Sequence, residues 1–164
     1  MPLEPAITDI EQLQTNPALA ALLGWNRDAV QGAKWDRDEM TIYLERAALR
    51  DACHLLRTGS TDFNFLADLT CVDLYPTEPR FEIKYHLLSQ SRKERLRLTV
   101  RLNGEDANIE SLYPLWPACD FFEREVFDLY GVRFLGHPNL IRIMMPDDWE
   151  GHPMRKDYPV EGYR

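Results

Sequence analysis

The sequence predicts an α+β protein: a two-layer sandwich with helices on one face of a mostly antiparallel sheet, followed by an extended C-terminal arm. Three observations lead to this class. Residues 80–88 and 95–102 alternate apolar with mostly charged side chains, as half-buried strands do. Helical patterns precede and follow these strands, which is typical of helices packed on a sheet. Beyond residue 131 no regular period continues, although apolar residues remain frequent.

The first 60 residues predict helices around one strand. The expected elements are a short helix and a second helical turn within 8–23, broken at Pro17 and closed by Gly24, a turn-rich connection over 25–38, a strand over 39–44, and a helix over 46–57 that Gly59 ends. The strand alternates Met40, Ile42 and Leu44 with Thr41 and Tyr43, which indicates one buried face.

The middle of the chain predicts three further strands and one helix. The expected strands are 63–75, 80–88 and 95–102; a polar connection over 103–109 and a helix over 115–130 follow. Only the short polar segment 89–94 separates the last two strands. They should therefore pair antiparallel, with one apolar face buried and one basic face, including Thr99, in water.

Length and composition place the chain among ordinary globular domains. It has 164 residues, 45% of them hydrophobic and 28% charged, which suits one domain over 1–132 and an extended arm over 133–164. The start shows no signal-peptide pattern, and no apolar run is long enough to span a membrane. Cys53, Cys71 and Cys119 are widely spaced and predict reduced, buried, intracellular thiols.

The distribution of charge favours a protein partner over a nucleic acid. The formal net charge is -8, whereas nucleic-acid binding needs a basic face. Residues 80–101 nevertheless hold seven basic residues against two acidic ones, and residues 105–128 hold seven acidic residues against Arg124. Neighbouring segments of opposite sign suit docking to other proteins.

Three consecutive charges, Glu123, Arg124 and Glu125, stand out within the expected helix 115–130. The apolar stripe expected to face inward consists of Leu115, Cys119, Phe122, Val126 and Leu129. On the same wheel the two glutamates border this stripe on opposite sides, and Arg124 lies on the outer face with Asp120 and Asp128. Phe121 and Phe127 share that outer half. The face is either solvated, with intrahelical ion pairs, or covered by another surface.

The arm combines apolar residues with prolines and has no period. Gly136-His137-Pro138 recurs as Gly151-His152-Pro153. Such a segment is expected to gain order by lying on another surface, part of which can be its own domain. Arg155-Lys156-Asp157 is either a solvated cluster or an anchor that grips a carboxylate or a backbone carbonyl, and the adjacent Tyr158 and Pro159 favour the anchor.

The sequence argues against an enzyme in its own right. The four histidines come without the other parts of a catalytic or metal site, and no glycine-rich phosphate loop is present. Glu123, Glu125 and Asp128 face three directions on the wheel and cannot serve one substrate. A free hydrolase using His86 or His137 remains a rival hypothesis, as does a nucleic-acid module using the basic strand face.

Several motifs together resemble a known family. They are the run Glu123 to Phe134, Gly136-His137-Pro138, Arg142-Ile143, Arg155 to Pro159 and, upstream, Phe63 to Asp68, Val72-Asp73, Tyr85 to Leu88 and Ser111 to Pro117. The chain is similar to the thirty-kilodalton subunit, also called the C subunit, of the proton-pumping NADH:quinone oxidoreductase, respiratory complex I. The resemblance covers about 100 residues and little of the first 38. Ile141 stands where the family usually has a basic residue, and the chain resembles the separate form of this subunit, not the form fused to the D subunit.

The resemblance implies a structural subunit of a membrane-bound enzyme that transfers electrons from NADH to quinone and translocates protons. The chain itself would bind no cofactor or metal, because FMN and iron-sulfur clusters belong to partner subunits. It would sit in the peripheral arm beside the B and D subunits, on the cytoplasmic side of the cell (inner) membrane, with indirect membrane contact. The interface residues it implies are Glu123, Arg124, Glu125, Asp128, His137, Arg142, Arg155, Lys156 and Asp157. An equivalent subunit of a ferredoxin-dependent relative or a membrane-bound hydrogenase is the alternative.

Overall fold

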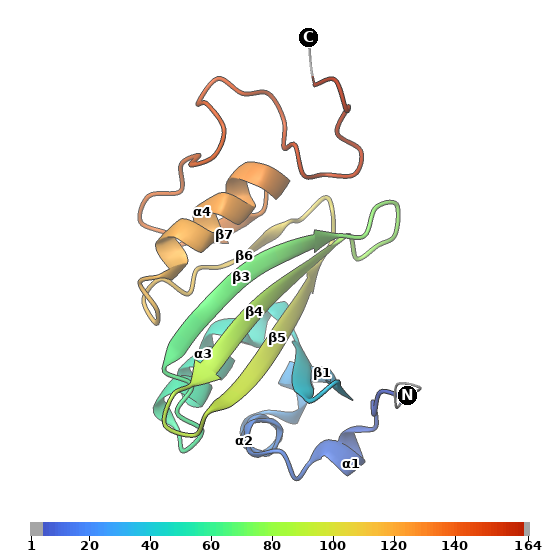
Figure 1. Ribbon diagram of the computed structural model, residues 1–164, viewed down its shortest axis with the longest axis vertical. Coiled ribbons are helices and arrows are strands. Elements are labelled where there is room, and N and C mark those ends of the chain that lie inside the picture. Colours follow the sequence, from blue (N-terminus) through green and yellow to red (C-terminus); the bar gives the residue numbers. More distant parts are fainter. Residues whose placement is uncertain (1–4, 163–164) are drawn as a thin grey trace. The chain divides into compact units, whose positions relative to one another are not determined.

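The larger of two sheets in the computed structural model, which describes residues 5–162, is a mixed sheet of five strands (Figure 1). Its strands are β1 (Val30–Asp36), β2 (Glu39–Leu44), β3 (Phe65–Asp73), β4 (Phe81–Ser89) and β5 (Glu94–Leu102), in the order β1-β2-β5-β4-β3. β1 pairs antiparallel with β2, and β2 pairs parallel with β5. The connections 74–80 and 90–93 are too short to cross over between parallel strands, so β3, β4 and β5 alternate in direction. The predicted α+β class is confirmed.

The alternating pattern of the central strands sets which side chains enter the core. Along β4, Phe81, Ile83, Tyr85 and Leu87 are buried and the residues between them are half-buried, as predicted. The expectation of a fully wet face on β5 is wrong at Thr99, which is completely buried. The charged alternate positions of this face, unlike Thr99, stay partly or fully exposed.

The N-terminal helices differ in detail from the prediction. They are α1 (Ile10–Leu13), α2 (Pro17–Trp25) and α3 (Leu49–Thr58), with short 3-10 turns at Arg27–Ala29 (η1) and Arg46–Ala48 (η2). Pro17 does break the segment, but it does so as the first residue of α2, where its missing N–H costs nothing and the Asn16 side chain caps the helix. Gly24 lies inside α2 and does not end it.

Strand β1 corrects the prediction of a turn-rich connection over residues 25–38. Its register shifts between Val30 and Gly32, so the alternation of side chains that marks a strand is interrupted. Ala33 and Val30 are nevertheless buried, and Trp35 exchanges backbone hydrogen bonds with Ile7. The edge of the sheet at β1 is thereby partly covered by the chain's own N-terminal segment.

A second, smaller sheet follows the large one. It consists of β6 (Asn108–Glu110) and β7 (Arg133–Leu135), which pair in parallel. Between them runs α4 (Cys119–Tyr130), which contacts β7. The predicted helix over 115–130 therefore starts four residues too early, and Leu115 is buried in the turn before α4. The polar connection expected over 103–109 ends in a strand instead.

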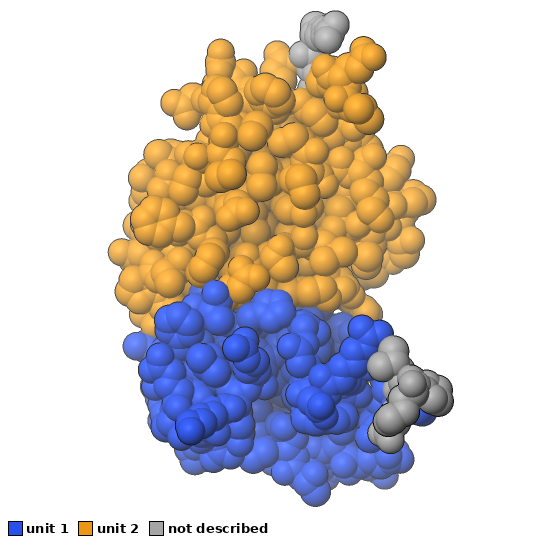
Figure 2. All heavy atoms as spheres, viewed as in Figure 1, with its two compact units in different colours: residues 1–67, 85–100 blue, residues 68–84, 101–164 orange. Residues whose placement is uncertain are grey.

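The chain forms two compact units (Figure 2). The first comprises residues 1–67 and 85–100, and the second comprises residues 68–84 and 101–164. The division between a domain over 1–132 and an arm over 133–164 stays a prediction, with residues 1–4 and 163–164 outside the described part. Cys53, Cys71 and Cys119 are buried free thiols, as predicted. None of the helices within residues 5–162 combines the length and apolar character needed to cross a bilayer.

Candidate functional site: the docked C-terminal arm

The arm, residues 133–162 of the described chain, supplies the hydrogen bonds that the C-terminal end of α4 lacks. The last four carbonyls of a helix have no partner within the helix. Here Gly131 N–H reaches the Phe127 carbonyl at 2.8 Å, while arm residues reach the other three. These bonds are Arg142 Nη1 and His152 Nδ1 to Asp128 O (3.2 and 2.9 Å), Met154 N to Leu129 O (3.1 Å) and Arg155 Nε to Tyr130 O (2.5 Å). Two arginines thus meet the negative end of the helix dipole.

Gly131 makes this close approach possible. It ends α4 with φ of 77°, a left-handed conformation that costs glycine little. A Cβ at this position would lie 2.5 Å from His152 Nε2 and 2.6 Å from Arg155 Nη2. Only a residue without a side chain therefore lets both arm residues pack on the helix end.

Asp128 is the main attachment point between α4 and the arm. Its side chain is fully buried, and its Oδ2 accepts the backbone N–H groups of Ile143, Met144 and Met145 at 3.0, 2.7 and 2.8 Å. Its Oδ1 accepts from Arg142 Nη1 at 2.5 Å. Burial alone would raise the pKa of Asp128, but the backbone donors and the Arg142 guanidinium outweigh it and lower that pKa. The Asp128 carboxylate of α4 is thus held in its ionised form by the arm residues that bind it.

Arg142 and Arg124 tie the same stretch of the arm from two sides. Besides Asp128, Arg142 donates through Nη2 to the carbonyls of Trp149 and Gly151, both at 3.0 Å. Arg124 donates to the carbonyls of Ile141 (3.2 Å) and Arg142 (3.3 Å), and its Nη1 lies 3.8 Å from Asp120 Oδ1. A guanidinium presents five donors in a fixed fork, so each arginine can fix two backbone groups at once.

His137 holds the start of the arm. Its buried ring accepts the Asn139 N–H at Nδ1 (3.0 Å) and lies 3.3 Å from the Asp120 carbonyl at Nε2. Because a carbonyl oxygen only accepts and a backbone N–H only donates, this geometry fixes the neutral tautomer with hydrogen on Nε2. His137 Nε2 also lies 3.6 Å from Asp120 Oδ1 and 4.0 Å from Glu123 Oε2.

Glu123 lies in the core and not at the border of the apolar stripe, where the wheel put it. It is fully buried; Oε2 accepts from Ser111 Oγ at 2.6 Å and Oε1 accepts the Leu112 N–H at 2.7 Å. Burial raises the pKa of Glu123 from 4.5 to about 7, although these two hydrogen bonds oppose the rise. The residue therefore anchors the 111–112 segment to α4. Phe122 and Leu129, expected on the stripe, are only half-buried.

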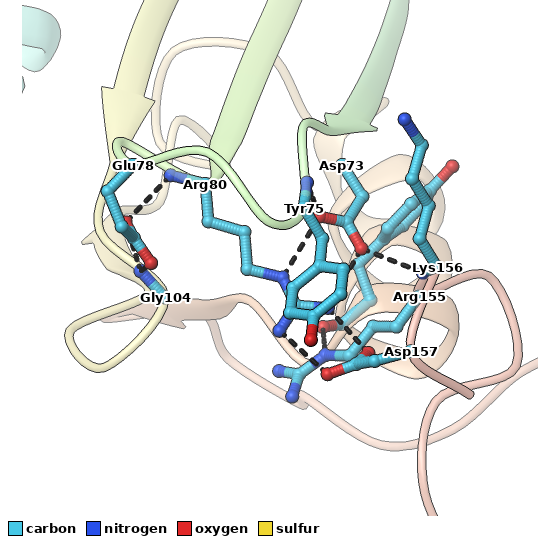
Figure 3. Close-up of polar contacts among 9 residues, drawn as sticks. Asp73, Tyr75, Glu78, Arg80, Gly104, Arg155, Lys156 and Asp157 are labelled. Carbon is cyan, nitrogen blue, oxygen red and sulfur yellow. Dashed lines mark hydrogen bonds and ion pairs between the residues drawn. The ribbon is translucent and has the colours of Figure 1, made fainter.

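A second attachment joins the far end of the arm to the end of β3. Figure 3 shows Arg80 between two carboxylates. Its Nε and Nη2 each donate to Asp73 at 2.9 Å, and its Nη1 and Nη2 donate to Asp157 at 3.0 and 2.6 Å. The Lys156 N–H donates to Asp73 Oδ2 at 2.9 Å. Two bidentate pairs on one guanidinium fix both distance and orientation.

The surroundings of Arg80 strengthen its ion pairs with Asp73 and Asp157. Burial by itself would raise the pKa of Asp73, but hydrogen bonds from Arg80, Lys156 N–H and Tyr75 N–H lower it to about 2. The hydrogen bonds from Asp73 and Asp157 raise the pKa of Arg80. The guanidinium also lies 4.9 Å from the ring centre of Tyr75.

The structure brings together most of the residues that the sequence singled out. Six of the nine bind the arm, α4 or the buried Ser111 segment, and two more, Lys156 through its backbone and Asp157 through its side chain, bind Asp73 and Arg80 near the end of β3. Glu125 is the exception and is exposed. Their assignment to a subunit interface stays a prediction. Sequence reasoning missed Arg80, Asp73, Ser111 and His152 as parts of the site. The signal for Arg80 was its position at the start of an apolar strand, and the signal for Asp73 was its place in the motif Val72-Asp73.

The arrangement is chemically suited to holding backbone in place. His137 and His152 each use one ring nitrogen for a hydrogen bond to a backbone carbonyl of α4. Within residues 5–162, no cluster of three or more histidine, cysteine, aspartate or glutamate side chains has the geometry to hold a metal ion.

Comparisons with known proteins agree on one family. Residues 42–164 match the family described as respiratory-chain NADH dehydrogenase, 30 Kd subunit. The C subunit of the NADH-quinone oxidoreductase of Citrifermentans bemidjiense is 43% identical over 126 residues, which are 77% of this chain and 78% of the relative. That of Geobacter metallireducens is 40% identical over 150 residues, 91% of this chain and 92% of the relative.

Two solved structures share the fold. A trypsin-resistant fragment of Nqo5 superimposes with a TM-score of 0.57 and 32% identity, covering 62% of this chain and 83% of the fragment. A chain of the membrane-bound sulfane sulfur reductase, an archaeal respiratory membrane complex, reaches a TM-score of 0.74 at 22% identity, covering 90% of this chain and 86% of that one. The second likeness concerns the fold alone. From the match over residues 42–164 and the identity of its relatives, the chain belongs to the family of the 30-kDa subunit of respiratory-chain NADH dehydrogenase.

Proposed function

We propose that the chain is a non-catalytic structural subunit in the peripheral arm of a membrane-bound NADH:quinone oxidoreductase. Family membership and the names of its relatives, which are C subunits of NADH-quinone oxidoreductases, support this role. In this proposal FMN and iron-sulfur clusters in other subunits carry electrons from NADH to quinone, and the enzyme couples this transfer to proton translocation. The chain itself binds no cofactor and contributes a braced surface.

The proposal rests on the arm, which is held to the rest of the chain by its polar side chains and exposes apolar side chains to solvent. Its polar side chains bind α4 and β3, as described above. Several of its large apolar side chains are instead exposed to solvent: Met144, Met154, Ile141 and Leu135 are 50 to 58% exposed, and Phe121 of α4 is 60% exposed. A rigid segment that exposes this much apolar surface is typical of a protein that is covered by a partner.

The proposed partners are the subunits equivalent to B and D of the same enzyme. Glu123, Arg124 and Asp128 would set the position of α4 and the arm, while the exposed apolar residues would make the contact. Contact with the membrane would be indirect, through the complex, on the cytoplasmic side of the cell (inner) membrane.

Charge reversal at Arg124 tests the bracing role. Arg124→Glu removes two hydrogen bonds to arm carbonyls and places a negative charge beside Asp120. The expected result is a lower amount of assembled complex in membranes, with normal turnover per assembled complex. Arg50→Glu, on the exposed side of α3, is the matched control. Normal assembly with reduced turnover per complex would show that the bracing role is wrong.

A second candidate is the equivalent subunit of a related membrane complex with another electron donor; the fold shared with the sulfane sulfur reductase chain is compatible with either candidate. A ferredoxin-dependent relative of complex I or a membrane-bound hydrogenase belongs to this class. Purification of the tagged chain from its native membranes separates the two candidates. NADH-oxidising subunits should accompany it in the first case and be missing in the second.

A further inference from the structure

The basic stretch 80–101 is largely neutralised within the chain. Five of its seven basic side chains form ion pairs with carboxylates. The pairs are Arg80 with Asp73 and Asp157, Lys84 and Arg101 with Glu82, Arg92 with Glu94, and Arg97 with Glu39. These five charges are each engaged with a carboxylate of the same chain.

Lys93 and Arg95 are the two that remain. Both are exposed, and the side chain of neither makes a hydrogen bond or ion pair with any residue in the described part of the chain. Both line the same groove of about 380 Å³ in the first unit. Trp35, Phe63 and Asp38 form part of the same wall. The two unpaired cations of the stretch therefore meet at one concave surface, to which the half-buried Trp35 offers an aromatic ring, while Phe63 is buried. Glu94 also lines this surface, but it pairs with Arg92.

Charged residues at or next to the groove have left-handed backbone conformations that other residue types adopt more easily. Lys93 has φ of 55° and Asp38 has φ of 61°, and the neighbouring Arg37 has φ of 52°. Glycine or asparagine adopts this left-handed region at lower cost, and it is the usual choice in hairpin turns. Strained conformations persist where the surrounding structure enforces them, and they concentrate at binding sites.

We propose that this groove binds an acidic segment of a neighbouring protein subunit. The inference rests on the proposed function, which places the chain in a multi-subunit assembly. Carboxylates of the partner would pair with Lys93 and Arg95, and apolar side chains would contact Trp35. Asp38 disfavours a compact, highly charged ion such as phosphate, but it can accept a hydrogen bond from a peptide N–H. The polar lining also differs from the mostly apolar pockets that hold small molecules.

Zero-length carbodiimide cross-linking of the assembled complex in native membranes tests the proposal. The reagent joins an amine to a carboxylate that already forms an ion pair with it. We expect Lys93 to be linked to an aspartate or glutamate of another subunit, with the cross-linked peptides identified by mass spectrometry. Lys93→Arg should remove this product, because a guanidinium is not coupled, while preserving the charge and the assembly.

Charge reversal gives a second measurement. The Lys93→Glu/Arg95→Glu variant should lower the amount of chain recovered in the complex at least fivefold relative to Arg50→Glu/Arg27→Glu. The control changes the net charge equally at two other exposed positions.

The outcomes separate this inference from the proposed function. Co-purification with the other subunits, but with Lys93 linked only to its own chain or not linked at all, overturns the groove proposal alone; an anionic lipid or a free ion in the groove would give that result. Equal recovery of both double variants also overturns it. Failure of the wild-type chain to co-purify with any subunit overturns the proposed function.

Discussion

Replacing Asp128 by asparagine should release the arm from α4 without enlarging any side chain. Asp128 accepts four hydrogen bonds, three from backbone N–H groups and one from Arg142. In its better orientation an asparagine turns its oxygen toward the three N–H groups and its own NH₂ toward the guanidinium. The Arg142 bond is then lost, and two donors face each other beside a largely buried positive charge.

The size of the effect follows from these contacts. Removing one partner of a buried ion pair costs about 3–5 kcal/mol. Arg142 keeps its bonds to the carbonyls of Trp149 and Gly151, so the lower end, about 3 kcal/mol, applies here. At about 1.4 kcal/mol per factor of ten, the undocked arm should become about a hundredfold more populated.

Native-state hydrogen exchange of the full chain measures this population directly. The amides of Met144 and Met145 should lose about a hundredfold in protection, because Asp128 is their only acceptor among residues 5–162. Glu125→Gln is the matched control, since it neutralises an exposed carboxylate on the same helix. If Asp128→Asn leaves the protection of these amides within twofold of the wild-type value, the arm is not held by this carboxylate.

Three further variants test other parts of the site. Burial raises the pKa of Glu123 in the folded chain to about 7, so its contribution to stability is complete below pH 4.5 and is lost as pH rises through 7, by about 3 kcal/mol at most. Glu123→Gln should remove this dependence of the free energy of unfolding on pH, measured by urea unfolding between pH 4.5 and 8. An unchanged pH dependence would contradict the assignment. Arg80→Met should lower the free energy of unfolding by about 3–5 kcal/mol, because Asp73 keeps a buried charge, and adding Asp73→Asn should recover part of the loss; no recovery would contradict the pairing. Gly131→Ala should cost about 2 kcal/mol or more in the same assay, because its φ is positive and its Cβ would collide with His152; a neutral result would mean that the arm moves aside freely.

The sequence was sufficient for those elements whose pattern is regular and local. The strand over 39–44 has the predicted bounds, and β4 and β5 lie within one residue of theirs, because each alternates apolar and polar side chains over most of its length. β1 escaped prediction because its register shift interrupts that alternation. β6 and β7 have three residues each, too few for any period to be visible.

The candidate site could be predicted only in part, because its partners are distant in the sequence. A helical wheel places charges outside by default, and it cannot foresee that Ser111 and the Leu112 N–H satisfy a buried Glu123. Asp157 is 77 residues from Arg80, so no local pattern links them. The arm itself was predictable as an unusual segment, since its apolar residues have no period. Its attachment points required the three-dimensional contacts.

The C-terminal end of α4 is synthesised before the residues that bind its last carbonyls. The ribosome completes this helix before it makes Arg142, His152, Met154 and Arg155, which supply the bonds to its last carbonyls. At about 5–20 residues per second, the 25 residues from Tyr130 to Arg155 take roughly one to five seconds to appear. Until then the last turn of α4 has only water as a partner for three carbonyls, and it should fray. The surface offered by the arm and the helix end can therefore form only after synthesis has passed residue 155, so a shorter nascent chain cannot present it early to the wrong partner.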